Sequence, residues 1–358
     1  MTSSGEAYDR RLALQAFEDT KEGVKGLVDA GVTAIPAIFR HPPESLEGIT
    51  SPTDDVPAAI PTIDLSVARR EDAVALVRHA AGTVGFFQVV NHGVPAELMA
   101  GMLAGVRQFN EGPAEAKRAA YTRDRARKVR FSSNFDLFQS AAATWNDTLF
   151  FGLAPDPPPS EELPEALRDV ATDYGDAVTK VALCVLELLS ESLGLSSDHL
   201  REMGCAQSLN AACQYYPPCP EPHLTFGHKT HTDPGFLTVV LQDGMPGLQV
   251  LVDRSGAGGG SGTWVDVTHL ISNDQFKSVE HRVLANKSKD TARVSVASFF
   301  NTDMSRSTLY RPITDGHNPP IYMSVTAQEF IARFMSIGLD GRALDYYRLE
   351  HDPPTPHV

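Results

Sequence analysis

Two histidines and one aspartate lie in the sequence at a spacing that suits a metal ion. His231 and Asp233 are two residues apart in a strand-like run, so their side chains share one face of a strand. His281 lies in a later strand-like segment and can supply a third ligand. Two histidines and one carboxylate leave coordination positions open, which is the ligand set used for Fe(II) and oxygen chemistry. A structural zinc site would be closed.

A lone histidine is more often an ordinary surface or core residue than a ligand. We interpret His223 and His228 in this way. His228 comes three residues before His231, so the alternation of a regular strand predicts that its ring faces the other way.

An arginine and a serine form a second candidate group. Arg293 and Ser295 share one face of the apolar strand predicted over 292–300. A guanidinium with a neighbouring hydroxyl can hold a carboxylate bidentately. By itself such an arginine would more often pair with an acidic residue at the surface. Together with the metal ligands, it predicts a 2-oxo acid that chelates iron at one end and contacts Arg293 at the other.

Short strand-like runs separated by Pro, Gly, Asn and Asp extend over 209–324 and carry all of these residues. Before them, apolar residues at helical spacing predict one long core helix, or two abutting ones, over 163–195. Helical patterns also cover 10–30, 71–83, 95–128 and 327–335, and strand patterns cover 60–65, 85–90 and 130–153.

The composition excludes some classes of function. Lys and Arg total 31 against 45 Asp and Glu, and the net charge of −14 repels nucleic acid and anionic membranes. The chain begins with no basic and apolar leader, and it has no apolar run long enough to span a bilayer, so we expect a cytoplasmic protein. The four cysteines have no CxxC spacing, which favours reduced thiols.

Several motifs resemble the plant 2-oxoglutarate/Fe(II) dioxygenases, the isopenicillin N synthase-like family, over nearly the whole chain. They are His231-Thr-Asp233, Ser278-Val-Glu-His281-Arg-Val283, Arg293-x-Ser295, Gln214-Tyr-Tyr-Pro-Pro-Cys219, Ile60-Pro-Thr-Ile-Asp-Leu65 and Gly85-Phe-Phe-Gln-Val-Val-Asn-His-Gly93. Segments starting at Tyr8, Phe17 and Ile38 resemble the subgroup of 1-aminocyclopropane-1-carboxylate oxidase homologues. That subgroup includes grass dioxygenases of benzoxazinoid glucosides such as DIBOA-glucoside.

The resemblance implies a fold of the α+β class that is mainly β: a double-stranded β-helix, or jelly roll, wrapped by helices. We expect an N-terminal arm (1–55), a helix and strand region (56–205), the Fe(II)- and 2-oxoglutarate-binding β-helix (206–324) and a C-terminal helix and tail (325–358). Tyr216 would add a hydroxyl to the 2-oxoglutarate site, while Gln214 stands where the family usually has Asn.

The implied activity is that of a monomeric dioxygenase that hydroxylates a small plant secondary metabolite with O₂ and 2-oxoglutarate, releasing succinate and CO₂, with ascorbate as reductant. We expect a planar aromatic or heterocyclic substrate, glucosylated or not, such as a benzoxazinoid glucoside. Candidate substrate contacts, each of which could equally be core, are Phe131, Asn134, Phe138, Trp145 and Phe300.

One departure from the family pattern concerns the β-helix itself. Trp264-Val-Asp-Val267 runs through three residues into Ile271, where the family has a further strand of small and apolar residues ending in Gly-Asp. We therefore expect one core strand to be missing near 268–270. Two alternatives stay open: an ascorbate-dependent oxidase like 1-aminocyclopropane-1-carboxylate oxidase, and a homologue impaired by the missing strand.

Overall fold

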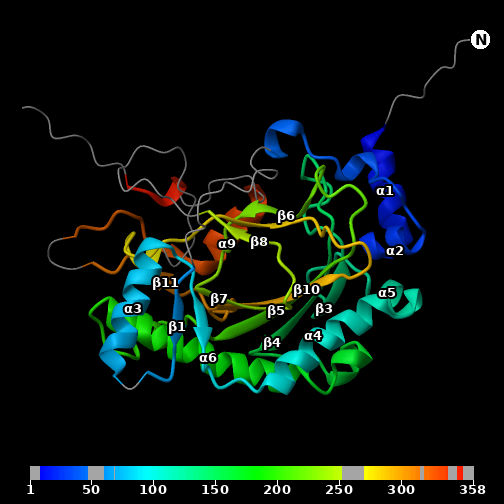
Figure 1. Cartoon of the computed structure of the whole chain (residues 1–358). Coiled ribbons are helices and arrows are strands. Elements are labelled where there is room, and N and C mark those ends of the chain that lie inside the picture. The colour runs from blue at the N-terminus through cyan, green and yellow to red at the C-terminus, as the bar shows by residue number, and fades with distance from the viewer. Residues whose placement is uncertain are drawn as a thin grey trace, which may run out of the picture.

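The computed structural model describes residues 9–46, 60–67, 69–251, 270–314, 318–337 and 345–349. Two facing β-sheets form its centre, with helices packed on the outer side of the larger sheet (Figure 1). The predicted jelly-roll core of an α+β protein, mostly β, is confirmed.

The larger sheet has five antiparallel strands in the order β3-β4-β5-β10-β7. Their bounds are Val129–Ser132 (β3), Asp147–Ala154 (β4), Ser208–Tyr216 (β5), Arg293–Asn301 (β10) and Leu237–Gln242 (β7). The smaller sheet has the order β6-β9-β8, with bounds Phe226–His231 (β6), His281–Leu284 (β9) and Leu248–Val250 (β8). The candidate ligands His231, Asp233 and His281 come together between the two sheets.

Short strand pairs lie outside these sheets. They are β1 (Thr62–Asp64) with β2 (Gln88–Val90), in parallel, and β11 (Leu309–Tyr310) with β12 (Val325–Thr326). The β1 and β2 pair confirms the strands expected within 60–65 and 85–90.

The α-helices are α1 (Arg10–Thr20), α2 (Gly23–Asp29), α3 (Arg70–Thr83), α4 (Ala96–Glu111), α5 (Ala114–Ala120), α6 (Ala171–Ser192), α7 (His199–Glu202) and α9 (Ala327–Ile337). The 3₁₀ turns are η1 (Ala37–Phe39), η2 (Pro43–Leu46), η3 (Ser160–Glu162), η4 (Glu165–Leu167) and η5 (Asp345–Tyr347). No described helix has both the length and the apolar character needed to cross a membrane.

Helix α6 is the long core helix that the sequence predicts. Its apolar face packs against the larger sheet with Tyr174, Val178 and Ala182, while Val185 and Leu189 join the cluster formed with α3. Two other helix predictions were too long. The helix expected over 95–128 breaks at Gly112-Pro113 and ends at Ala120, because proline cannot donate a helical hydrogen bond. The helix expected over 10–30 is interrupted at Lys21, whose φ is 54°.

The N-terminal helices pack on the loop between β3 and β4. Phe17 and Phe39 contact each other, and Phe39 contacts Trp145, in edge-to-face geometry with ring centroids 5.3 and 5.1 Å apart. Asp147 accepts hydrogen bonds from the backbone N–H groups of Val24 (2.7 Å) and Lys25 (2.8 Å) at the start of α2. These hydrogen bonds hold the N-terminal helices against the start of β4.

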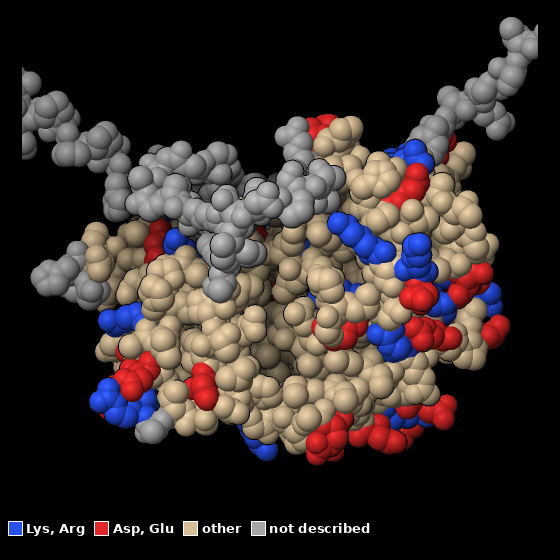
Figure 2. All heavy atoms as spheres, in the orientation of Figure 1, with Lys and Arg blue, Asp and Glu red and all other residues tan. Residues whose placement is uncertain are grey.

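We expected a core strand to be missing near 268–270, and residues 252–269 lie outside the described part of the chain, so this expectation stays a prediction. The chain is described again from Leu270, which is buried with Ile271 against α6. Strand β7 ends the larger sheet, and none of the described strands pairs with its outer edge. Figure 2 shows that Lys, Arg, Asp and Glu gather towards the rim of this face, whereas its centre is largely uncharged and hollowed.

Candidate metal centre

His231, Asp233 and His281 converge at one point between the two sheets. His231 ends β6 and His281 begins β9, and the register of these strands pairs the two residues directly. The Nε2 atoms of His231 and His281 lie 3.6 and 3.7 Å from Asp233 Oδ1. One potential ligand atom from each side chain lies within 4.8 Å of the others, which is the geometry needed to surround one ion.

Backbone carbonyls set the orientation of both imidazoles. His231 Nδ1 lies 2.8 Å from the carbonyl of Lys229, and His281 Nδ1 lies 3.2 Å from that of Val279, each in position to donate. With Nδ1 carrying the proton, Nε2 keeps its lone pair towards Asp233. This carbonyl support is the usual arrangement behind metal-binding histidines.

The protonation states suit a cation. Burial would raise the pKa of the Asp233 carboxyl, but His281 and His231 beside it lower that pKa below its ordinary value. Burial and the neighbouring His231 lower the pKa of His281. The group therefore offers a carboxylate and, at His281, a neutral imidazole, which is the ligand form of histidine.

The prediction that His228 faces away from His231 was wrong. The two rings lie 4.2 Å apart and 31° from parallel. The cause is an irregularity in the pairing of β6 with β9 between these two residues, which breaks the alternation of the strand. Nothing in the sequence marks this irregularity.

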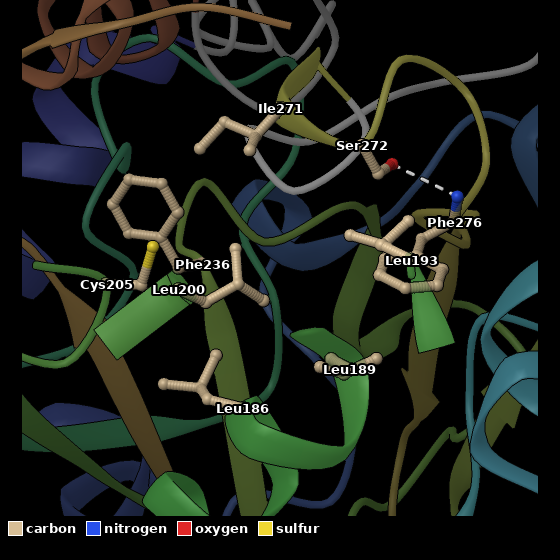
Figure 3. Close-up of a pocket in the computed structure, with 9 residues that line it drawn as sticks. All are labelled: Leu186, Leu189, Leu193, Leu200, Cys205, Phe236, Ile271, Ser272 and Phe276. Atoms are coloured by element: carbon tan, nitrogen blue, oxygen red, sulfur yellow. Dashed lines mark hydrogen bonds between the residues drawn. The ribbon is translucent and has the colours of Figure 1, made fainter. Parts of the chain in front are cut away.

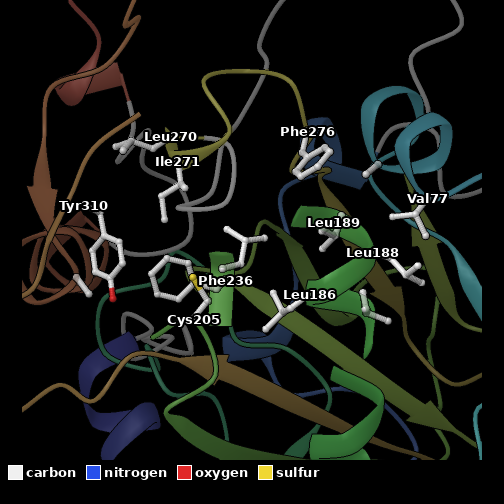
Figure 4. Packing of buried hydrophobic residues seen from close by; sticks show 14 of the residues in the cluster. Val77, Leu186, Leu188, Leu189, Cys205, Phe236, Leu270, Ile271, Phe276 and Tyr310 are labelled. Carbon is white, nitrogen blue, oxygen red and sulfur yellow. The ribbon is translucent and has the colours of Figure 1, made fainter. Parts of the chain in front are cut away.

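The hydrophobic core holds both ligand-bearing segments. Phe236, three residues after Asp233, and Phe276, five before His281, pack with Leu186 and Leu189 of α6 (Figure 4). Figure 3 shows Phe236 and Phe276 around a gap of only about 10 Å³, beside which Ser272 Oγ accepts a hydrogen bond from the Phe276 N–H (3.0 Å). Such a gap holds at most one water, so the packing leaves the segments that carry Asp233 and His281 little freedom.

Arg293 lies in the same interior and is only 2% exposed. Its Nη2 donates to Gln242 Oε1 (2.8 Å), its Nε to the Met245 carbonyl (3.3 Å) and its Nη1 to Ser295 Oγ (3.4 Å). Within the described residues no carboxylate pairs with it. A buried guanidinium without an acidic partner favours a bound anion. Sequence reasoning missed Gln242, because an amide that orients an arginine has no motif.

Tyr216 stacks beside this guanidinium, with the Arg293 Cζ 5.0 Å from the ring centroid. Burial raises the pKa of the Tyr216 hydroxyl, against the lowering influence of Arg293 and of a hydrogen bond with Ser295, so the phenol remains a donor. Gln214 has a different place: its Oε1 accepts from Asn146 Nδ2 (2.8 Å) and Thr148 Oγ1 (2.7 Å), which ties β5 to β4.

The five candidate substrate contacts divide by burial. Phe131 and Phe300 are 0% exposed within the core behind the larger sheet, where a substrate could touch them only if the core opened. Asn134 Nδ2 donates to the Thr144 carbonyl and Asn134 Oδ1 accepts from the Thr144 N–H, which joins the two ends of the loop between β3 and β4. Trp145 lies in the core cluster formed with the N-terminal helices. Phe138 alone is exposed, at 48%, with Arg123 5.7 Å from its ring centroid.

A cavity of about 460 Å³ reaches Asp233 and His281 from the side of β7. Phe86, Phe87 and Val89 line it opposite α6, and the Phe86 ring lies 5.6 Å from that of His281. Its volume is typical of a small-molecule site. The sequence did not single out these residues as site residues.

Comparison with known proteins shows which family has this site. The profile described as "2OG-Fe(II) oxygenase superfamily" matches residues 207–302, and that described as "non-haem dioxygenase in morphine synthesis N-terminal" matches 60–170. A protein of Arabidopsis thaliana named 1-aminocyclopropane-1-carboxylate oxidase homolog 1 is 45% identical over 94% of this chain and 95% of its own length. The chain belongs to the 2OG-Fe(II) oxygenase superfamily.

Further relatives of this oxygenase support the same family assignment. A probable 2-oxoacid dependent dioxygenase of Arabidopsis thaliana is 44% identical over 92% of this chain and 96% of its own. The crystal structure of JOX2 in complex with 2OG, Fe and JA has a TM-score of 0.77 at 28% identity, covering 92% of this chain and 98% of that one. A rice dioxygenase for auxin oxidation shares the fold, with a TM-score of 0.65 at 24% identity over 81% and 100% of the two chains. The protein is a dioxygenase that uses Fe(II) and 2-oxoglutarate.

Proposed function

We propose that His231, Asp233 and His281 bind the Fe(II), and that Arg293, Ser295 and Tyr216 bind the distal carboxylate of 2-oxoglutarate. The observation that carries this assignment is the buried Arg293, which lacks an acidic partner among the described residues and lies in the interior that holds the His-Asp-His group. Three protein ligands leave room for a chelating 2-oxo acid and for O₂.

Bound Fe(II) would activate O₂, which is the oxidant of the reaction. Two of the four electrons that O₂ takes up would come from 2-oxoglutarate as it becomes succinate and CO₂, and the other two from the substrate C–H bond that is hydroxylated. The residues of the protein orient the groups that bind iron and 2-oxoglutarate. Lys229 and Val279 hold the imidazoles through their carbonyls, and Gln242 holds the guanidinium fork so that its remaining N–H groups face the carboxylate. The apolar walls at Phe86 and Leu237 exclude water from the reacting centre.

For the substrate we propose a small, largely planar aromatic or heterocyclic metabolite that becomes hydroxylated. A benzoxazinoid glucoside is the specific candidate. The Phe86 ring near His281 lines the cavity and supports an aromatic substrate, whereas Phe138 is not among the residues that line it. The solved relative JOX2 was crystallised with 2OG, Fe and JA, which supports a small organic substrate.

The test is succinate formation and oxygen uptake by the purified protein with Fe(II), 2-oxoglutarate and a panel of plant metabolites. We expect turnover that requires 2-oxoglutarate and that ascorbate increases only as a reductant. Oxygen uptake with ascorbate and no 2-oxo acid would favour the oxidase alternative. Exclusive activity on amino acids or on protein side chains would refute the substrate class.

We also infer that the enzyme works as a monomer in the cytoplasm. The net charge of −14 supports a protein without nucleic acid or anionic membrane partners. Light scattering after size exclusion and imaging of a tagged protein test the two statements, which a stable dimer or an organellar signal would respectively contradict.

A further inference from the structure

The turn after β7 is bound to the strand that carries Arg293. Residues 243–247 lead from β7 of the larger sheet to β8 of the smaller one. The Asp243 N–H donates to the Val294 carbonyl (3.0 Å), and Asp243 Oδ2 accepts from the Val294 N–H (2.7 Å). One aspartate therefore holds both backbone polar groups of the residue next to Arg293.

The same carboxylate also shapes the turn. Asp243 Oδ1 accepts from the Met245 N–H (3.1 Å), which is the side-chain bond of an Asx turn. Helix α4 adds a bond from outside, because Arg107 Nη2 lies 3.3 Å from Asp243 Oδ2 and donates to the Ala292 carbonyl (2.9 Å). The aspartate thereby fixes the place of Met245 relative to β10.

Two residues of this turn contact the Arg293 side chain itself. The Met245 carbonyl accepts the Arg293 Nε–H (3.3 Å). A Cβ added to Gly247 would lie 3.1 Å from Arg293 Cδ and 3.2 Å from its Nε, which is closer than favourable van der Waals contact. A Cβ added to Gly244, in the same turn, would meet nothing within 4 Å. Neither glycine has a positive φ, so space and not backbone conformation explains why residue 247 is a glycine.

We propose that Asp243 and Gly247 are positioning residues for the anchor of 2-oxoglutarate, because they fix the turn that holds the Arg293 side chain. With this side chain held beside Gln242, its remaining N–H groups face the carboxylate before the ligand arrives. An arginine that is already in its binding conformation loses less freedom on binding, which raises the affinity. The inference rests on the proposed function, in which Arg293 binds the distal carboxylate.

The test is equilibrium binding of 2-oxoglutarate to the Fe(II)-loaded protein without O₂, followed by the visible charge-transfer absorption of the iron chelate. Gly247→Ala should raise the Kd for 2-oxoglutarate by about 2- to 10-fold, which corresponds to the cost of ordering one long side chain on binding. The absorption maximum at saturation and the affinity for Fe(II) should stay unchanged, because the iron ligands are not altered. Gly244→Ala is the matched control and should bind 2-oxoglutarate like the unaltered protein. An unchanged Kd in Gly247→Ala, or an equal rise in both glycine variants, would overturn the proposal.

Asp243→Asn tests the carboxylate. The variant keeps the size of the side chain, but its single acceptor oxygen cannot serve the Val294 and Met245 N–H groups as the two carboxylate oxygens do. The Kd for 2-oxoglutarate should rise in the same range, and an unchanged Kd would overturn the role of Asp243. If Asp243→Asn does not fold, Arg107→Met replaces it, since it removes the cation beside the same carboxylate, and it should shift the Kd in the same direction. An unchanged Kd in Arg107→Met would then overturn that role.

A double variant separates this inference from the proposed function. If the turn acts through Arg293, Gly247→Ala should raise the Kd of Arg293→Lys far less than it raises the Kd of the unaltered protein, because the fork that the turn orients is gone. Full additivity would overturn the positioning role. A raised Kd in Arg293→Lys with an unchanged Kd in Gly247→Ala would refute the positioning role alone, whereas an unchanged Kd in Arg293→Lys would refute the proposed function itself.

Discussion

Substitution of Arg293 by lysine should raise the KM for 2-oxoglutarate and leave the iron site intact. Lysine keeps the charge but cannot make the contacts of the fork with Gln242, Met245 and Ser295. Losing one charge-assisted hydrogen bond costs about 1.5 to 3 kcal/mol, and each 1.4 kcal/mol is about a factor of ten. We therefore expect the KM to rise roughly 10- to 100-fold, with kcat at saturating 2-oxoglutarate changed far less.

The assay is succinate formation over a range of 2-oxoglutarate concentrations, with Fe(II) affinity measured separately. Arg282→Lys is the matched control, because Arg282 lies on β9 next to His281 and its Nε also donates to a glutamine, Gln249 (2.8 Å). It should leave the KM unchanged. An unchanged KM in Arg293→Lys, or an equal rise in both variants, would refute the role of Arg293 as the anchor.

Three further predictions concern stability. A variant with a family-like strand inserted after Val267 should melt at a higher temperature and bind Fe(II) more tightly. Equal stability and activity of both forms would show that residues 264–275 rebuild the barrel by another route. Gly23→Ala should lower the free energy of unfolding, measured in urea, more than Gly31→Ala. Both glycines have positive φ, a conformation that costs alanine about 1 to 2 kcal/mol. Only at Gly23 would the new Cβ overlap the Asp147 carboxylate. Equal losses would mean that Asp147 moves freely. Lys229→Met should lower the free energy of unfolding by about 3 kcal/mol or more, because it leaves Asp136, whose carboxylate lies 2.9 Å from the Lys229 Nζ and is 7% exposed, as a buried charge without this partner. The double variant with Asp136→Leu should recover part of this stability, and no recovery would show that the pair is not coupled.

Residue chemistry and spacing were enough to predict which three side chains would come together as candidate metal ligands. His231 and Asp233 are two residues apart, and the register of β6 with β9 places His281 next to them. The contact between Arg293 and Ser295 was also predictable, since both residues share a strand face, and their binding of a carboxylate stays a prediction. Both inferences depend only on strand alternation, which holds where pairing is regular.

The failures occurred where tertiary structure overrides local pattern. The pairing irregularity after His228 turned that residue towards His231. The aromatic stretch from Phe131 to Phe151 contains core, loop and surface residues, and composition cannot separate them. The cavity beside β7 is formed by α6, β7 and the segment before β2, which are distant in the sequence. Only the folded chain brings them together.

Anaerobic equilibrium binding of Fe(II) tests the central claim most directly. The protein should bind one Fe(II) per chain, and His231→Ala, Asp233→Ala and His281→Ala should each abolish turnover and lower the affinity by more than about 100-fold, because loss of a group behind a ligand already costs roughly 10- to 100-fold. His223→Ala, a histidine outside the site, should bind like the unaltered protein. Retained affinity or turnover in any of the three site variants would contradict the assignment of the metal centre.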